Sequence, residues 1–251
     1  MPYNSIPLIT LAVDTTSPGG SAATLRDERV IGSVSTWTDE TYSSRIFRQV
    51  EFLLEELALG LGQVDLFAVA NGPGSFTGLR VGIAAVKAWA EVYGKPAVGV
   101  SALEAIAAQS RSASPILAPV FDARRGEVYF SFYRREVSLA APELVRQGEY
   151  SVMAPPGFLQ AVHARLGDAP ITVVTPTPEA LSAAMAQSNG DPKTDKNFAI
   201  EVVPNILAPV IGLLAVRRAT HSHGHEATGD ALTLEANYVR RTDAELKWKE
   251  L

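Results

Sequence analysis

Short apolar segments and one strongly periodic segment alternate along the first part of the chain. Residues 7–13 form a short apolar run, and residues 21–25 and 29–36 are two further segments with strand character. In residues 43–61 the apolar side chains instead recur every three or four positions, which is the period of an amphipathic helix. The pattern therefore predicts a three-stranded meander followed by a helix.

Strand and helix patterns then alternate. Residues 63–70 and 97–100 have the character of buried strands, and residues 79–93 between them have that of a helix. A third helix is expected from Ser101, with Glu104 three positions later, which is the spacing of a capping box that satisfies two N–H groups at a helix start. This order of elements predicts an α/β domain with a mixed sheet.

A second strand–turn–strand pattern begins after residue 113. Residues 115–121 and 127–134 are predicted strands around a turn at 122–126, residues 207–219 are a predicted helix, and the Pro-containing residues 136–178 give no clear period. We divide the chain into an N-terminal α/β lobe with a Gly-rich loop (1–110), a second, more degenerate α/β lobe (111–205), and a C-terminal helix and tail that we expect to pack back on the first lobe (206–251).

Composition narrows the functional classes. Of the 251 residues 47% are hydrophobic, and the formal net charge is −5 at pH 7. Proteins that bind nucleic acid alone usually carry a basic face, so this charge disfavours such a function but allows a subunit whose partner supplies the basic surface. The chain has no Cys and therefore no disulfide or thiolate metal site. Because no apolar stretch is long enough to span a bilayer, we expect a soluble, cytoplasmic protein.

A glycine-rich loop at residues 71–78 (NGPGSFTG) is the first candidate for chemistry. It lies between a predicted strand and a predicted helix, where backbone N–H groups favour an anion. Leu79 stands where a Walker A lysine would follow, and the glycine spacing is not a dinucleotide fingerprint. A phosphate-binding loop and a tight turn that packs helix against strand both remain open. The candidate phosphate-binding residues are Gly72, Gly74, Ser75, Thr77 and Gly78.

Asp14 ends the first predicted strand and is followed by Thr15 and Thr16. Ligands bind at the carboxyl ends of strands in open α/β sheets, where a carboxylate can hold a metal-bound water or orient a nucleophile. An aspartate in a turn can instead accept hydrogen bonds from neighbouring backbone N–H groups. We take these three residues as a vestigial phosphate site.

Three histidines lie near the C-terminus. His221 and His225 are four residues apart, a spacing that lets two imidazoles share a metal on one helix face, and His223 lies between them. A closed zinc site needs further ligands, so a solvated loop is the interpretation that we prefer and no metal site is predicted.

The predicted helix at residues 43–61 is apolar over more than a narrow stripe. Such a helix either lies between two layers of the core or presents a surface to a partner. We predict a partner interface formed by residues of this helix and of the next one: Ile46, Gln49, Val50, Leu53, Leu54, Arg80, Ile83 and Lys87.

Four segments together resemble the TsaB (YeaZ) family. They are LITLAVDTTSPGGSAATL (8–25), VANGPGSFTGLRVGIAAVKAWAEVYGKPAVGVSALEAIA (69–107), FDARRGEVYFSFY (121–133) and NYVRR (237–241). The resemblance implies an α/β, two-lobed actin-like ATPase and sugar-kinase fold (ASKHA, ribonuclease H-like). It also implies a non-catalytic scaffold or activator of the TsaD–TsaB–TsaE complex, which forms N6-threonylcarbamoyladenosine next to the anticodon of tRNA.

The resemblance further implies the partners TsaD and TsaE, contact with tRNA only through the complex, and a homodimer when the chain is alone. No cofactor of its own is implied, and ATP or ADP would bind at the interface with the partner. Three departures fit a non-catalytic chain: no His in residues 8–134, Tyr42 where relatives often have His, and Thr16 where the superfamily's phosphate loop has Gly. The alternatives are a small-molecule kinase or ATPase of the same superfold and, after it, a metallopeptidase.

Overall fold

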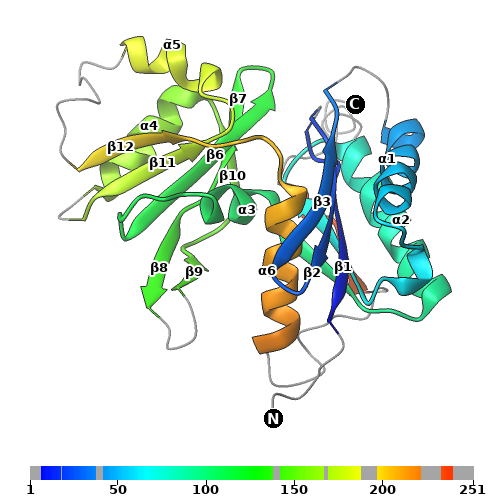
Figure 1. Ribbon diagram of the computed structural model, residues 1–251. Coiled ribbons are helices and arrows are strands. Elements are labelled where there is room, and N and C mark those ends of the chain that lie inside the picture. The colour runs from blue at the N-terminus through cyan, green and yellow to red at the C-terminus, as the bar shows by residue number, and fades with distance from the viewer. Residues whose placement is uncertain are drawn as a thin grey trace. The chain divides into compact units, whose positions relative to one another are not determined.

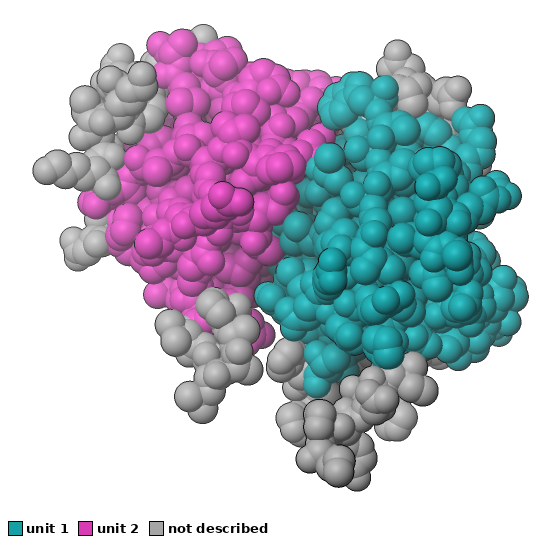
Figure 2. Space-filling model, in the orientation of Figure 1, with its two compact units in different colours: residues 1–105, 206–237 teal, residues 106–205, 238–251 magenta. Residues whose placement is uncertain are grey.

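The computed structural model of the chain describes residues 7–17, 19–37, 42–137, 142–166, 169–187, 197–221 and 233–239. The chain forms two units, which are drawn in different colours in Figure 2. Unit 1 consists of Met1–Ala105 and Ile206–Asn237, and unit 2 consists of Ile106–Asn205 and Tyr238–Leu251. The division thus falls after Ala105, and the segment from Ile206 to Asn237 is part of unit 1.

A five-stranded mixed sheet forms the centre of unit 1, in the order β3-β2-β1-β4-β5 (Figure 1). The strands β1, β2 and β3 are an antiparallel meander, and β4 and β5 run parallel to β1. This is the arrangement that the alternating pattern predicts. The strand bounds are β1 (Ile9–Asp14), β2 (Ser21–Arg26), β3 (Arg29–Ser35), β4 (Leu66–Gly72) and β5 (Ala97–Ser101).

Helices cover both faces of this sheet. The helices α1 (Tyr42–Glu56) and α2 (Phe76–Tyr93) lie on one face, and α6 (Ala208–His221) lies on the other, against β1, β2 and β4 (Figure 1). A short helix α3 (Ala102–Ala108) follows β5, and a 3-10 turn (Leu61–Gln63) precedes β4. The predicted helix at 43–61 is therefore too long: α1 ends at Glu56, and Ala58 has a left-handed φ of 50°.

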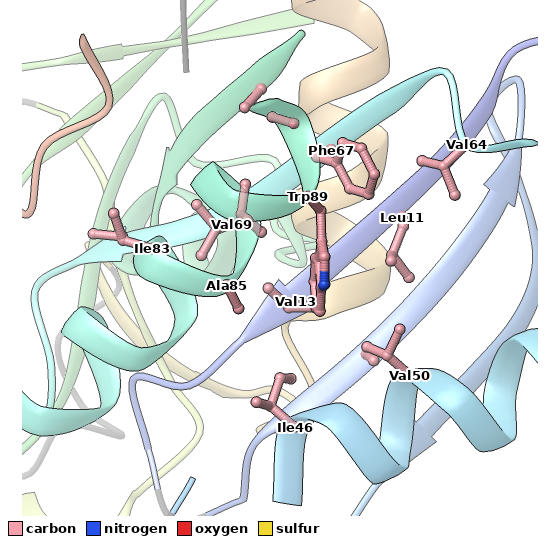
Figure 3. Close-up of a cluster of buried hydrophobic side chains, with 14 of the residues drawn as sticks. Leu11, Val13, Ile46, Val50, Val64, Phe67, Val69, Ile83, Ala85 and Trp89 are labelled. Carbon is pink, nitrogen blue, oxygen red and sulfur yellow. The ribbon is translucent and has the colours of Figure 1, made fainter. Parts of the chain in front are cut away.

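The main core of unit 1 lies between the sheet and the pair α1–α2 (Figure 3). Trp89 of α2 packs with Phe67 of β4 at a ring-centroid distance of 6.0 Å, and Phe47 of α1 meets the same indole edge-on at 5.9 Å. Val50 and Leu53 of α1 are also buried here. Since full burial of one such side chain contributes roughly 1.5–3 kcal/mol, this layer fixes both helices on the sheet.

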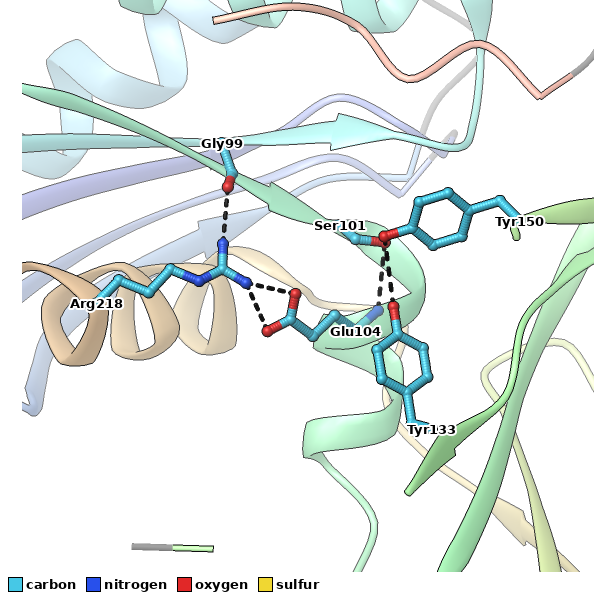
Figure 4. Close-up of polar contacts among 6 residues, drawn as sticks. All are labelled: Gly99, Ser101, Glu104, Tyr133, Tyr150 and Arg218. Carbon is cyan, nitrogen blue, oxygen red and sulfur yellow. Dashed lines mark hydrogen bonds and ion pairs between the residues drawn. The ribbon is translucent and has the colours of Figure 1, made fainter. Parts of the chain in front are cut away.

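Polar contacts tie α6 to β5 and α3. The Arg218 guanidinium donates to the carbonyl oxygen of Gly99 at 2.8 Å and to the Glu104 carboxylate at 2.6 Å (Figure 4). Glu104 N donates to Ser101 Oγ at 3.5 Å, but the Glu104 carboxylate binds Arg218 instead of returning to the Ser101 N–H. The predicted capping box is therefore only half formed.

Unit 2 contains a second mixed sheet, in the order β10-β7-β6-β11-β12, to which β8 and β9 are added beside β6. The helices α4 (Pro155–Arg165) and α5 (Glu179–Gln187) pack together and close a core around Phe130, Phe158 and Val173. The strand bounds are β6 (Ile116–Arg124), β7 (Glu127–Phe130), β8 (Tyr133–Val137), β9 (Pro142–Arg146), β10 (Ser151–Met153), β11 (Ile171–Thr175) and β12 (Phe198–Val202).

The opening hairpin of unit 2 differs from the prediction in two ways. The strand β6 continues to Arg124, so that only Arg125 and Gly126 form the turn. The predicted strand at 127–134 is divided at Ser131, because β7 and β8 pair with different parts of β6. In the part of the chain that the structure describes, no helix has both the length and the apolar character needed to cross a bilayer.

Candidate functional site

The glycine-rich loop joins the end of β4 to the start of α2, as predicted. Ser75 is the N-cap of α2, and its Oγ accepts a hydrogen bond from Gly78 N at 3.2 Å. Thr77 is exposed in the first turn. On the other side of the loop, Asn237 N donates to Asn71 O at 2.7 Å, so residues of the C-terminal segment cover the end of β4.

The loop packs tightly on the residues that follow β1. Ser75 N donates to Thr16 O at 2.8 Å, and Thr15 Oγ1 donates to Gly78 O at 2.7 Å. A Cβ on Gly78 would overlap the carbonyl oxygen of Thr15, and one on Gly74 would overlap Thr16. The glycines are thus required for close packing of chain on chain, which supports the tight-turn interpretation. The N–H groups of Ser75 and Gly78 are donated within the chain, so these two groups are not offered to a ligand in this arrangement.

Asp14 lies completely buried beneath this loop. Its Oδ1 accepts hydrogen bonds from Thr16 N at 2.9 Å and Thr16 Oγ1 at 2.6 Å, and its Oδ2 has no hydrogen-bond partner among the described residues. Burial raises the pKa of Asp14 above its ordinary value, and the two bonds from Thr16 offset this only in part. Burial thus disfavours the charged form of Asp14 relative to an exposed aspartate. Among the described residues no group of three or more His, Cys, Asp or Glu side chains could hold a metal ion.

The structure corrects the predicted partner interface. Five of its apolar residues line the core between α1, α2 and the sheet, and the largest exposed fraction among them is 7%. Gln49 is buried as well, and its Nε2 donates to Thr36 Oγ1 at 2.7 Å. These side chains therefore pack within the chain's own core and cannot contact a partner while unit 1 stays folded. The five residues are Ile46, Val50, Leu53, Leu54 and Ile83.

The opposite sides of the same two helices are exposed and carry apolar residues that the prediction missed. Phe47 and Phe52 of α1 are 50% and 55% exposed, and Val92 at the end of α2 is 75% exposed. Along α2 the exposed positions recur every four residues, which places them in one row. Arg80 is exposed in this row, and Lys87 is half-buried beside it. We call this surface the α1–α2 outer face and define it by Phe47, Phe52, Arg80, Ala84, Ala88 and Val92.

A signal for this face was present in the sequence. The helix α2 has Ala or Val on nearly every side, whereas a helix at the edge of a monomer usually has one polar face.

Comparison with known proteins identifies the family. A family model described as TsaD: tRNA N6-adenosine threonylcarbamoyltransferase matches residues 27–176, which is more than half of the chain. The protein named tRNA threonylcarbamoyladenosine biosynthesis protein TsaB from Bacillus subtilis is 36% identical over 124 residues. The protein of the same name from Haemophilus influenzae is 37% identical over 133 residues. The solved structure of YeaZ from Pseudomonas aeruginosa superposes with a TM-score of 0.69 at 25% identity. The chain belongs to the TsaD family, in its TsaB (YeaZ) branch.

The extent of each similarity differs between sequence and structure. The sequence match covers 49% of this chain and 54% of the B. subtilis protein, and 51% and 55% for the H. influenzae protein. The chain thus spans about half the length of the curated relatives it matches. The structural match to P. aeruginosa YeaZ covers 92% of this chain and 99% of that one. The two α/β units therefore have the fold of the solved YeaZ structure.

Some predicted residues cannot be placed. His221 is the last residue of α6. His223 and His225 lie outside the described residues. Tyr42 is the first residue of α1, but its side chain lies outside the described part. The tail beyond residue 239 also lies outside it.

Proposed function

We propose that the chain is a non-catalytic subunit that activates the threonylcarbamoyltransferase TsaD, in a complex with TsaD and TsaE that forms N6-threonylcarbamoyladenosine next to the anticodon of tRNA. The α1–α2 outer face carries this proposal. It places large apolar side chains in water on two helices whose other sides are fixed in the core. Exposed aromatic residues of this kind are typical of the centres of protein–protein interfaces.

The shape of the outer face suits another helix pair. Ala84 and Ala88 leave the middle of α2 without long side chains, so a partner helix could approach closely, with Phe47 exposed on the neighbouring helix where it meets Trp89. Arg80 is the residue at the N-terminal end of this row. Its guanidinium lies over the ring of Phe76, 3.8 Å from the ring centroid. TsaD, as a relative with the same fold, would offer the corresponding helices, and a second copy of this chain would do so when TsaD is absent.

The region around Asp14 supports a role without catalysis. The loop N–H groups of Ser75 and Gly78 are donated within the chain, and burial of the Asp14 carboxyl favours its neutral form. We infer that the chain has no nucleotide cofactor of its own and that TsaD holds any ATP or ADP. A complex that acts on tRNA would work in the cytoplasm.

Reconstitution tests the activating role. TsaD, TsaE and tRNA from the same organism are combined with threonine, bicarbonate, ATP and the enzyme that forms the threonylcarbamoyl adenylate, with and without this chain. We expect modification of the tRNA to require the chain, and the chain alone to hydrolyse no ATP above the blank. Modification that proceeds equally well without the chain would refute the role, and ATP turnover by the chain alone would favour the kinase alternative.

A variant of the outer face tests the contact itself. Ala84→Arg adds a long charged side chain at an exposed helical position, so unit 1 should fold normally while co-elution with TsaD and tRNA modification are lost. Ala183→Arg, at an exposed position of α5, makes the same chemical change elsewhere and should behave like the wild type. Co-elution of Ala84→Arg with TsaD at wild-type affinity would show that the outer face is not the contact.

A further inference from the structure

The hairpin between β6 and β7 carries two adjacent arginines at its tip. The strands β6 and β7 form a hairpin (Figure 1). Arg124 pairs with Glu127 after a register shift between Asp122 and Arg124, and the loop consists of Arg125 and Gly126. Arg124, Arg125 and Gly126 are all exposed. A Cβ placed on Gly126 would meet no atom within 4 Å, so the end of the hairpin faces open space.

Both arginines have a backbone conformation that residues with a Cβ avoid. The φ angle is +61° at Arg124, +56° at Arg125 and +73° at Gly126. A two-residue loop with positive φ at both positions is a type I′ turn, in which Asn-Gly and Asp-Gly are preferred. Positive φ disfavours arginine both at position 125 in the loop and at position 124 beside it, and strained non-glycine residues concentrate at functional sites. What the side chains bind is therefore a better explanation for them than the turn itself.

The base of the hairpin holds the tip in a defined position. Asp122 Oδ1 accepts a hydrogen bond from Arg124 N at 2.7 Å, and Asp122 N donates to Thr177 Oγ1 at 3.0 Å. Phe121 and Tyr129 are opposite each other in the register, with ring centroids 5.4 Å apart. The two arginines are thus presented from a rigid support.

Three other arginines of unit 2 have structural roles. Arg135 donates to Ser110 O at 2.9 Å, Arg146 lies over the ring of Tyr150 at 4.1 Å, and Arg165 lies over the ring of Phe132 at 4.3 Å. The Arg124 guanidinium makes no comparable contact with any residue that the structure describes.

We propose that Arg124 and Arg125 bind the phosphate backbone of the tRNA that the complex modifies. This inference rests on the proposed function, because that function brings the chain into contact with tRNA. Guanidinium groups form paired hydrogen bonds to phosphate oxygens and stay charged at any physiological pH. A chain of net charge −5 repels RNA except where cations project beyond its own carboxylates. At the tip the Asp122 carboxylate is turned back to the Arg124 N–H, and the two arginines outnumber the other carboxylate of the hairpin, that of Glu127 opposite Arg124.

The experiment measures tRNA binding by the complete complex assembled with the double variant R124G/R125N. The variant gives the turn the residues that it favours, so its thermal midpoint should be no lower than that of the wild type. Loss of two phosphate contacts should raise the Kd for tRNA about tenfold and lower the slope of log K against log salt by about 2. Arg134→Ala removes an exposed arginine from β8 of the same unit and should change neither quantity.

The outcomes separate the inference from the proposed function. An unchanged Kd and salt slope in a fully assembled R124G/R125N complex would overturn the inference while the activating role stands. A second outcome would also overturn the inference: TsaD or TsaE dissociates from the R124G/R125N complex, and the complex that remains binds tRNA with unchanged affinity. The arginines would then bind a carboxylate of a partner protein. Failure of the wild-type chain to assemble with TsaD would instead refute the proposed function before any variant is compared.

Discussion

Two neighbouring residues of α1 separate a core role from a partner role. Leu53 is 4% exposed and packs against the sheet near Gly32, whereas Phe52 is 55% exposed on the α1–α2 outer face. Leu53→Ala should lower the free energy of unfolding by about 3 kcal/mol, the middle of the range for a buried Leu→Ala change. Phe52→Ala removes a side chain that is more than half in water, and we expect a loss of less than about 1 kcal/mol.

The assay is thermal unfolding of the isolated chain, followed by size-exclusion chromatography with TsaD. For a chain of this size 1 kcal/mol corresponds to about 2–4 °C, so Leu53→Ala should lower the Tm by about 6–12 °C and Phe52→Ala by less than about 4 °C. In the complex the order is reversed: Phe52→Ala weakens binding of TsaD, and Leu53→Ala binds normally at a temperature where it is folded. Equal Tm losses for Leu53→Ala and Phe52→Ala, or a Leu53→Ala protein of wild-type stability, would refute the placement of these residues.

Two further variants test the region around Asp14. Burial raises the pKa of Asp14 in the folded state, so the contribution of Asp14 to stability is full below the unfolded pKa of about 3.9 and is lost as pH rises through the folded pKa. Asp14→Asn should remove this loss, so that its Tm relative to the wild type rises as pH increases above about 4 and becomes constant above the folded pKa; parallel pH profiles would contradict this. Gly78→Ala forces a Cβ against the Thr15 carbonyl and should cost about 3 kcal/mol in denaturant unfolding. Gly60→Ala, where the nearest atom would be Gln63 Oε1 at 3.8 Å, should cost far less.

The fold of unit 1 could be predicted from the sequence because its elements have strong and distinct periods. The short apolar strands and the three- and four-residue spacing of α1 give the right order of elements. The end of α1 was missed because Leu57, Leu59 and Leu61 continue the apolar pattern after the helix has stopped, and they still pack against the core. The spacing of apolar residues shows which side chains face the core. Because residues of a turn can also face the core, the spacing does not show where the helix ends.

Much of unit 2 could not be assigned for a related reason. The Pro-containing residues 136–178 give no clear period, yet Pro155 and Pro156 occupy the first turn of α4. The missing N–H of proline does no harm there, because the first N–H groups of a helix have no partner within it. Pro142 likewise begins β9. Proline can mark either the start of a helix or strand or a break in regular structure. The residues packed around it in the fold show which of these two roles a given proline has.

The side of α1 that meets a partner could not be read from periodicity either. The stripe of Ile46, Val50 and Leu53 has the spacing of a buried face, but this spacing does not show whether the chain's own sheet or another protein buries it. The stripe of Ile46, Val50 and Leu53 packs against the sheet of unit 1. Under the proposed function, Phe47 and Phe52 remain exposed for contact with a partner. The predicted apolar interface residues are therefore core residues of unit 1, and a contact of a partner with the other side of α1 and α2 stays a proposal.

The glycine-rich loop and the α1–α2 outer face are connected through α2. Gly78 and Gly82 let α2 approach Thr15 so closely that a methyl group at either position would displace the helix. The same helix carries Ala84 and Ala88 on its opposite side, one and two turns further on. The tight turn of the glycine-rich loop thus fixes the position of α2 and of the exposed row that α2 carries.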